Sequence, residues 1–276
     1  MNAATSAHRL IRVRRGNPCP VCGHDSWCSI GEGIVVCQRV PSDRPTKAGG
    51  GYIHRIGSAM PARTVDRHPP ALSKLSSAEC TLIDRQCRAD ITPERIARLS
   101  DRLGVSASSL RRLGIGWHHD RDAYTFPMRD AAGTLIGIRL RYPDRSKRAV
   151  SGSRLGIVNP INDDGAVVAA EWLLVCEGES DAAAALDLGF AAIGRPGCET
   201  CGPIITGYVR RVRPERVAVI ADADDPGQRG AHKLARSIAT DACIPSRVLT
   251  LPAAKDLRVW KRLPDSSHHD LLALLE

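Results

Sequence analysis

Three acidic side chains follow two short apolar runs, and their type and spacing suit the binding of Mg²⁺ or Mn²⁺, which prefer carboxylate oxygens. Glu177 comes directly after the run 172–176. Asp222 and Asp224 come directly after the run 216–221. Because these two aspartates lie two positions apart, their side chains leave an extended chain on the same face. The alternative interpretation is a solvated loop or a helix N-cap, positions that Asp also favours.

Strands and helices must position these acids, and the hydrophobic pattern predicts how. Both apolar runs are short, rich in β-branched residues and followed by a helical pattern, which predicts two buried parallel strands, each with a crossover helix. In such sheets the reactive groups lie beyond the carboxyl ends of the strands, where all three acids would meet. Asp181 lies four residues after Glu177, one turn into the first crossover helix, so its side chain can face the same site.

Four cysteines near the N-terminus have a spacing typical of a zinc site, namely Cys19, Cys22, Cys28 and Cys37. A structural Zn²⁺ takes four thiolate or imidazole ligands in tetrahedral geometry, and His24 is the alternative to Cys28 as a ligand. A redox-active C-x-x-C is another interpretation, but no βαβ pattern surrounds it. We expect one structural zinc ion, because so short a segment cannot build a sufficient core unaided.

The strand–acid–helix pattern resembles a known domain. The stretches from Leu174 to Asp181 and from Val219 to Gly227 are similar to the two motifs of the TOPRIM domain, which bacterial-type primases, topoisomerases and some nucleases share. The resemblance extends over residues 170–262 and implies a late acidic metal ligand, to which Asp256 corresponds. The usual second acid, two positions further on, is replaced here by Arg258.

Residues 1–55 resemble the zinc ribbons at the start of bacterial-type and phage-type primases. The ligand spacing is nearest to a variant found in mobile-element proteins, which favours a phage or plasmid origin. The resemblance implies contact with a single-stranded DNA template. Trp27 is the candidate for stacking on a template base, with packing inside the ribbon as the alternative interpretation. Residues 38–73 are rich in Pro, Gly and basic residues, and a flexible linker is expected at 56–73.

Residues 74–166 are predicted to contain helices followed by a β-hairpin. Ser76 and Glu79 suit a capping box at the start of the first helix. Alternating apolar residues then predict two strands on either side of a turn at 130–133.

Basic residues in and after this hairpin suit phosphate binding, namely Arg139, Arg141, Lys147, Arg148 and Arg154. Guanidinium groups pair bidentately with phosphate, and Arg139 and Arg141 share one face of their strand. The alternative interpretation is an ordinary exposed sheet face. The segment also resembles the basic subdomain that precedes TOPRIM in primases, which implies contacts with the template–primer duplex and the incoming nucleotide.

The net charge is +9, and the basic surplus lies upstream of residue 167. Basic segments beside an acidic metal site suit a nucleic-acid partner, although charge alone also serves solubility. No apolar run reaches the length of a membrane span. The Arg-rich first 15 residues lack the apolar core of a secretory signal, so we expect a cytoplasmic protein without a membrane partner.

These features predict an α/β protein with a zinc ribbon at 1–55, a linker at 56–73, a basic subdomain at 74–166 and a parallel-sheet, TOPRIM-like domain at 167–276. The order of these parts resembles a DNA primase without a helicase domain. The resemblance implies a single-stranded DNA template and nucleoside triphosphates as ligands, with a separate replicative helicase as a further candidate partner.

In this interpretation the aspartates at 181, 222, 224 and 256 would hold Mg²⁺ or Mn²⁺ for nucleotidyl transfer. Glu177 would help to bind metal or act as a general base toward the attacking hydroxyl. A TOPRIM nuclease would use the same acids with water as the nucleophile. A non-enzymatic replication accessory or DNA-binding protein is the third hypothesis, and the basic residue at 258 keeps it open.

Overall fold

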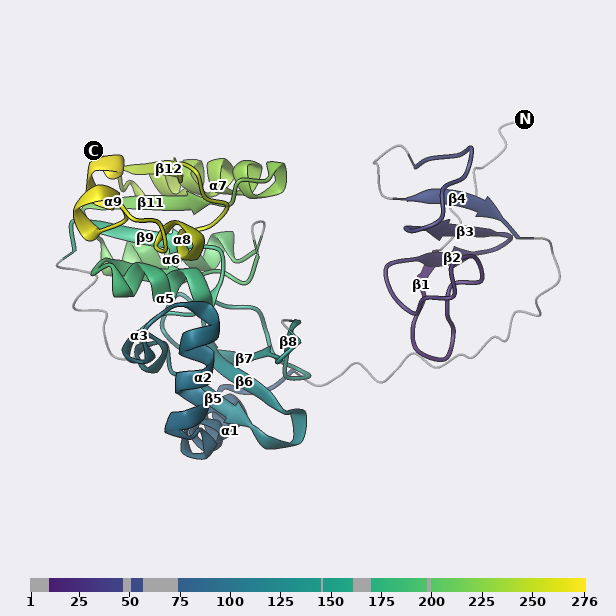
Figure 1. Ribbon diagram of the computed structural model, residues 1–276, viewed down its shortest axis with the longest axis horizontal. Coiled ribbons are helices and arrows are strands. Elements are labelled where there is room, and N and C mark those ends of the chain that lie inside the picture. Colours follow the sequence, from purple (N-terminus) through teal and green to yellow (C-terminus); the bar gives the residue numbers. More distant parts are fainter. Residues whose placement is uncertain (1–9, 47–50, 57–73, 145, 161–169, 198–199) are drawn as a thin grey trace. The chain divides into compact units, whose positions relative to one another are not determined.

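The chain forms two compact units, residues 1–68 and 69–276 (Figure 1). The computed structural model describes residues 10–46, 51–56, 74–144, 146–160, 170–197 and 200–276. Of the predicted linker at 56–73, only Ile56 lies within the described residues. No helix in these ranges is both long enough and apolar enough to cross a membrane.

The first unit contains a four-stranded antiparallel sheet in the order β1-β2-β3-β4. Its strands are β1 Ile11–Arg12, β2 Ser29–Gly31, β3 Ile34–Cys37 and β4 Tyr52–Arg55. Among the described residues of this unit, those that are buried are Val13, Val35 and three of the cysteines. Because so small a core stabilises little by burial alone, the cysteine cluster is the main constraint on this fold.

The second unit begins with three helices and an antiparallel sheet in the order β5-β6-β7-β8. The helices are α1 Ser77–Asp90, α2 Pro93–Leu103 and α3 Ala107–Arg112. The strands are β5 Gly116–His118, β6 Ala123–Arg129, β7 Leu135–Arg141 and β8 Lys147–Ala149, with the short 3₁₀ helix η1 His119–Arg121 after β5.

The local signals in this part of the sequence are confirmed. Ser76 and Glu79 form the predicted capping box at the start of α1. Strands β6 and β7 pair as the predicted hairpin. In its turn, Asp130 Oδ1 accepts hydrogen bonds from the backbone N–H groups of Ala132 and Thr134.

A parallel sheet in the order β10-β9-β11-β12 follows. Its strands are β9 Trp172–Cys176, β10 Ala191–Gly194, β11 Arg216–Ala221 and β12 Ser246–Thr250. The helices are α5 Glu179–Asp187, α6 Gly202–Val212, α7 Asp225–Ser237, α8 Leu257–Trp260 and α9 His268–Leu275, and a π-helical turn, η2 Ile238–Ala242, follows α7. The two predicted strands and their helices are therefore confirmed.

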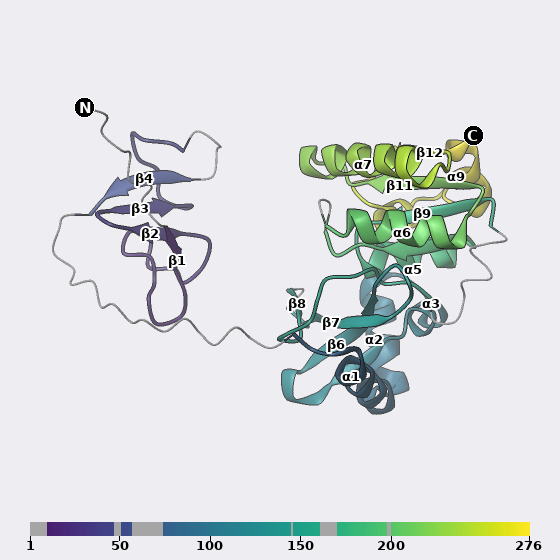
Figure 2. The ribbon, with the colours of Figure 1, turned by 180° about the vertical axis from the view of Figure 1, so that it is seen from behind.

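Helices cover both faces of this parallel sheet (Figures 1 and 2). Leu174 and Ala218 face the side that α5, α8 and α9 cover, where four fully buried alanines, residues 182–185, let α5 pack closely. Leu173 and Val217 face the other side, which α6 and α7 cover. Since successive side chains of a strand point to opposite faces, this layering explains why the strands are apolar without alternation.

A short segment joins the two sheets of the second unit. Ile157 forms a bridge to Arg129 at the end of β6, and Val158 forms a bridge to Gly194 at the end of β10. The basic hairpin is thereby fixed next to the carboxyl end of the parallel sheet, where the acidic residues lie.

Candidate active site and zinc centre

The sulfur atoms of Cys19, Cys22, Cys28 and Cys37 lie within 4.8 Å of one another. Cys28 is fully buried, whereas His24 is exposed and is not part of this group. The backbone N–H of Gln38 donates to Cys28 Sγ at 3.4 Å, and that of Val40 donates to Cys37 Sγ at 3.3 Å. Four converging sulfurs with backbone donors fit one structural zinc ion, held as thiolates.

In the second unit, the first acids lie where β9 and β11 end. Glu177 follows β9, and Asp222 follows β11. Gly178 has a φ of 106°, and a Cβ atom on Gly194 would lie 2.6 Å from the carbonyl oxygen of Gly178. These glycines let the loops after β9 and β10 approach closely, which brings Glu177 to the edge of the sheet.

Asp224 has a different environment from Asp222. It is the N-cap of α7, and its Oδ1 accepts a hydrogen bond of 2.7 Å from the backbone N–H of Gly227. A helix N-cap was the alternative interpretation of Asp222 and Asp224, and such a cap is present at Asp224. Its carboxylate does not line the cleft that the other acids share.

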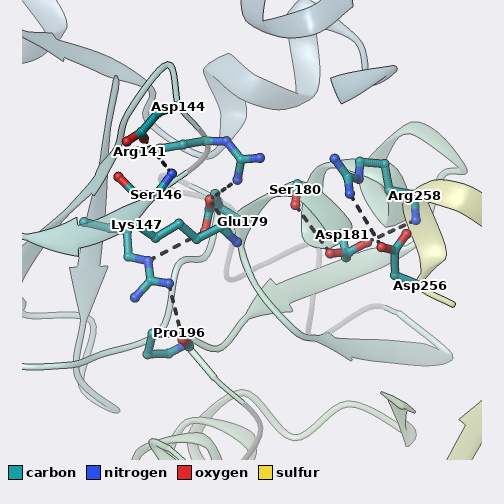
Figure 3. A network of polar contacts seen from close by, with 11 residues as sticks. Arg141, Asp144, Ser146, Lys147, Glu179, Ser180, Asp181, Pro196, Asp256 and Arg258 are labelled. Atoms are coloured by element: carbon teal, nitrogen blue, oxygen red, sulfur yellow. Dashed lines mark hydrogen bonds and ion pairs between the residues drawn. The ribbon is translucent and has the colours of Figure 1, made fainter. Parts of the chain in front are cut away.

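Asp181 and Asp256 lie together with Arg258 (Figure 3). The backbone N–H of Arg258 donates to Asp181 Oδ1 at 3.0 Å. The guanidinium Nη2 of Arg258 lies 3.5 Å from Asp256 Oδ2. Asp256 also caps α8 by accepting a hydrogen bond of 2.8 Å from the backbone N–H of Val259. The start of α8 thus brings the late acid next to the first turn of α5.

One cleft of about 580 Å³ collects these groups. Its acidic residues are Glu177, Asp181, Asp222 and Asp256, and its basic residues are Arg102, Arg139, Arg141, Lys147, Arg195, Lys255, Arg258 and Arg262. Carboxylates from the parallel sheet thus share a cleft with cations that come partly from the β7–β8 hairpin. This combination suits a metal ion and a polyphosphate bound side by side.

Glu179 connects the hairpin to the parallel-sheet part of the unit (Figure 3). Its side chain is 1% exposed, and its Oε1 lies 2.7 Å from Arg141 Nη1 and 3.5 Å from Lys147 Nζ. Its Oε2 lies 3.9 Å from Arg139 Nε. Burial alone would raise the pKa of Glu179, but the charges of Lys147, Arg141 and Arg139 outweigh it and lower the pKa to about 2.

The remaining acids have raised pKa values. Burial raises the pKa of Asp222 to about 7, and the charges of Glu177, Asp181 and Asp256 add to the effect. Burial and the charge of Asp256 raise the pKa of Asp181 to about 6. Burial also raises the pKa of Glu177, against the opposing charge of Arg195. Carboxylates crowded in this way favour a bound cation, because the cation removes their mutual repulsion.

The surroundings of Glu177 fit such a cation. Its Oε2 is buried, and no described residue donates a hydrogen bond to it. In the described parts of the chain, the four cysteines form the only group of three or more candidate ligands within 4.8 Å of one another. The acids of the cleft would therefore bind Mg²⁺ or Mn²⁺ together with water and substrate oxygens, as is usual for Mg²⁺.

The predicted phosphate-binding residues divide into two sets. Arg139, Arg141 and Lys147 line the cleft, and the two arginines are largely buried against Glu179 instead of lying on an exposed sheet face. Arg148 and Arg154 are exposed and do not line the cleft.

Trp27 belongs to the first unit, where its side chain is 68% exposed, so it is not a core residue of the ribbon.

The sequence patterns leave two charged residues unassigned: Arg195, which lines the cleft, and Glu179, which is buried against the cleft residues Arg139 and Arg141. Arg195 directly follows β10, as Glu177 follows β9. Its position at the end of a strand is the sequence signal from which a place in the site could have been predicted. No comparable signal exists for Glu179. Its partners come from another subdomain, and the spacing of residues within its own helix does not reveal them.

Solved structures of primases share this architecture. The DnaG catalytic core superposes with a TM-score of 0.56 at 17% identity, covering 72% of this chain and 78% of that chain. The DnaG primase catalytic domain bound to single-stranded DNA gives 0.55 at 19% identity, covering 71% and 77%. The Aquifex aeolicus primase, with zinc-binding and RNA polymerase domains, gives 0.55 at 14% identity, covering 100% and 80%.

This chain has the fold of a bacterial-type primase. No family model and no curated protein matches its sequence. The predicted fold class, a zinc ribbon followed by a basic α+β subdomain and a TOPRIM-like parallel sheet, is confirmed.

Proposed function

We propose that this chain is a DNA primase, which joins nucleoside triphosphates into short primers on single-stranded DNA. The observation that carries the proposal is the meeting of two groups in one cleft of a primase-type fold. Carboxylates lie at the ends of β9 and β11, and cations from β7 and β8 line the same cleft. The similar DnaG catalytic domain was solved with single-stranded DNA bound, which supports this type of template.

In the proposed reaction, the 3′-hydroxyl oxygen of the primer attacks the α-phosphorus of a nucleoside triphosphate, and pyrophosphate leaves. Glu177 and Asp222 would hold Mg²⁺ or Mn²⁺, which supplies Lewis acidity at the attacking and phosphate oxygens. Arg139 and Lys147 would bind the triphosphate, since each keeps donors beyond its contact with Glu179. Arg195 adds a further positive charge at the end of β10.

The first unit would contact the template. The four-cysteine site would fold this unit around zinc, and the exposed indole of Trp27 supports stacking on an unpaired base. Trp27 has a left-handed backbone, with a φ of 70°, and lies two residues before the start of β2. We propose that this unit presents the template to the cleft.

Labelled-nucleotide incorporation on circular single-stranded DNA tests the proposal. With Mg²⁺ or Mn²⁺ the parent is expected to make short oligomers, and Glu177→Gln is expected to make none. Glu171→Gln is the matched control, because Glu171 is half exposed and its ion pair with Arg216 lies outside the cleft. Metal-dependent degradation of the template that Glu177→Gln abolishes would instead assign a nuclease. Without either activity, the protein would be a binding module.

A further inference from the structure

The four acids of the cleft differ in how their charge is compensated. Asp181 and Asp256 both contact Arg258, the first through the backbone N–H at 3.0 Å and the second through the guanidinium at 3.5 Å. Neither Glu177 nor Asp222 has an ion-pair partner within 4.0 Å among the described residues, and Glu177 Oε2 is buried without a donor there. Within the described residues, a cation is therefore in direct contact with one side of the acidic group only.

Arg258 is well held in this position. The side chain of Arg258 is 23% exposed. Arg258 is the second residue of helix α8, and the carboxylate of Asp256 caps the start of this helix. A guanidinium stays protonated at every pH at which the protein is folded, so the charge beside Asp256 is permanent. A divalent ion bound by Asp181 and Asp256 would lie within a few ångströms of this charge and would be repelled by it.

Glu177 and Asp222 lie on the other side of the acidic group, where no cation is in direct contact with a carboxylate among the described residues. The carboxylates of Glu177 and Asp222 repel each other, and Arg195 and Lys147 act on Glu177 only from beyond ion-pair distance. A single divalent ion there would relieve that repulsion. Two ions in the cleft would require the guanidinium to leave Asp256.

We propose that this chain binds one divalent metal ion in the cleft, on Glu177 and Asp222, and that Arg258 serves Asp181 and Asp256 as a fixed cation in place of a second ion. The inference deepens the proposed function and rests on it for its catalytic meaning. Arg258 would give the phosphate-binding cleft a positive charge that does not depend on metal concentration. The metal dependence of primer synthesis would then follow the occupancy of a single site.

Counting bound Mn²⁺ tests this inference without DNA or nucleotide. The zinc-loaded full chain is titrated with MnCl₂, and free Mn²⁺ is measured by electron paramagnetic resonance. The parent is expected to bind one Mn²⁺ in the cleft, and Glu177→Gln none. Arg258→Asp is expected to bind two, because it removes the cation and adds a carboxylate beside Asp256. Arg258→Lys keeps the positive charge and is expected to bind one.

Arg262→Asp is the matched control, since Arg262 lines the same cleft but, among the described residues, forms no ion pair with the acids as Arg258 does. It is expected to bind one Mn²⁺, like the parent. If Arg258→Asp does not fold, Arg258→Gln is measured and is expected to show a second ion that binds about tenfold more weakly than the first. Two Mn²⁺ ions in the parent, or one in a folded Arg258→Asp or Arg258→Gln variant, would overturn the inference.

These outcomes are independent of the proposed function. A parent that binds one Mn²⁺ but makes no primers contradicts the primase proposal and leaves the single-ion site standing. A parent that makes primers and binds two contradicts the single-ion site alone.

Discussion

Replacing Glu179 with Gln should destabilise the second unit strongly, although the side chain keeps its size. Glu179 is 1% exposed and Arg141 is 7% exposed, so the substitution leaves a buried guanidinium without its counter-ion. Removing one partner of a buried ion pair costs roughly 3–5 kcal/mol. The lowered pKa of Glu179, from 4.5 to about 2, gives a similar magnitude, about 3 kcal/mol at about 1.4 kcal/mol for each pKa unit.

The stabilisation that ionised Glu179 provides should decrease at low pH. Because folding lowers the pKa of Glu179, its contribution to the free energy of unfolding is fully present above pH 4.5 and is lost as the pH falls toward 2. The difference in stability between the parent and Glu179→Gln should therefore shrink over that range. It should stay constant between pH 5 and pH 8, where Glu179 is ionised in both states.

Urea denaturation followed by tryptophan fluorescence measures this difference. Three of the four tryptophans, Trp117, Trp172 and Trp260, are buried in the second unit, so a Trp27→Phe background makes the signal specific for that unit. With a urea m-value of about 2 kcal/mol/M, the midpoint should fall by about 1.5 M.

A matched control variant shows whether the loss of any carboxylate would destabilise the second unit as much as the loss of Glu179. Glu171→Gln removes an ion pair whose side chains are 50% and 46% exposed, and it should change the free energy of unfolding by no more than about 1 kcal/mol. A Glu179→Gln variant that behaves like Glu171→Gln would refute the reasoning. It would mean that the hairpin cations do not depend on Glu179.

Three further predictions concern the zinc centre, a helix contact and the template. Cys28→Ser should release zinc and unfold the first unit, whereas His24→Ala should retain one zinc ion by metal analysis. Asp187→Asn should lower the free energy of unfolding by about 2 kcal/mol in urea, because it removes the charge that binds Lys261 Nζ at 2.6 Å. Trp27→Ala should weaken single-stranded DNA binding about tenfold in fluorescence anisotropy without changing stability.

Local patterns in the sequence were sufficient to predict much of the fold. The apolar runs before Glu177 and Asp222 form the parallel strands β9 and β11, because residues buried on both faces must be apolar without alternation. The capping box at Ser76 and the turn at Asp130 form as predicted, because their hydrogen bonds involve neighbours in sequence. Such features depend on a few adjacent residues only.

Contacts between distant segments could not be predicted in this way. Glu179 meets Arg141 across 38 positions, and Arg258 meets Asp181 across 77. The period of a helix or strand identifies which side chains share a face, but it does not identify which face of another subdomain lies opposite. For this reason the arginines of β7 could be predicted as phosphate ligands while their buried partner was missed.

In the proposed reaction, carboxylates of the parallel sheet and cations of the hairpin act on one bound nucleotide. Steady-state primer synthesis separates their contributions. Glu177→Gln should lower kcat at least a hundredfold, whereas Lys147→Gln should mainly raise the KM for nucleoside triphosphate, by about tenfold. Lys233→Gln, on the exposed face of α7, should change neither parameter. An unchanged KM in folded Lys147→Gln, or full activity in Glu177→Gln, would show that these groups do not act together on the nucleotide.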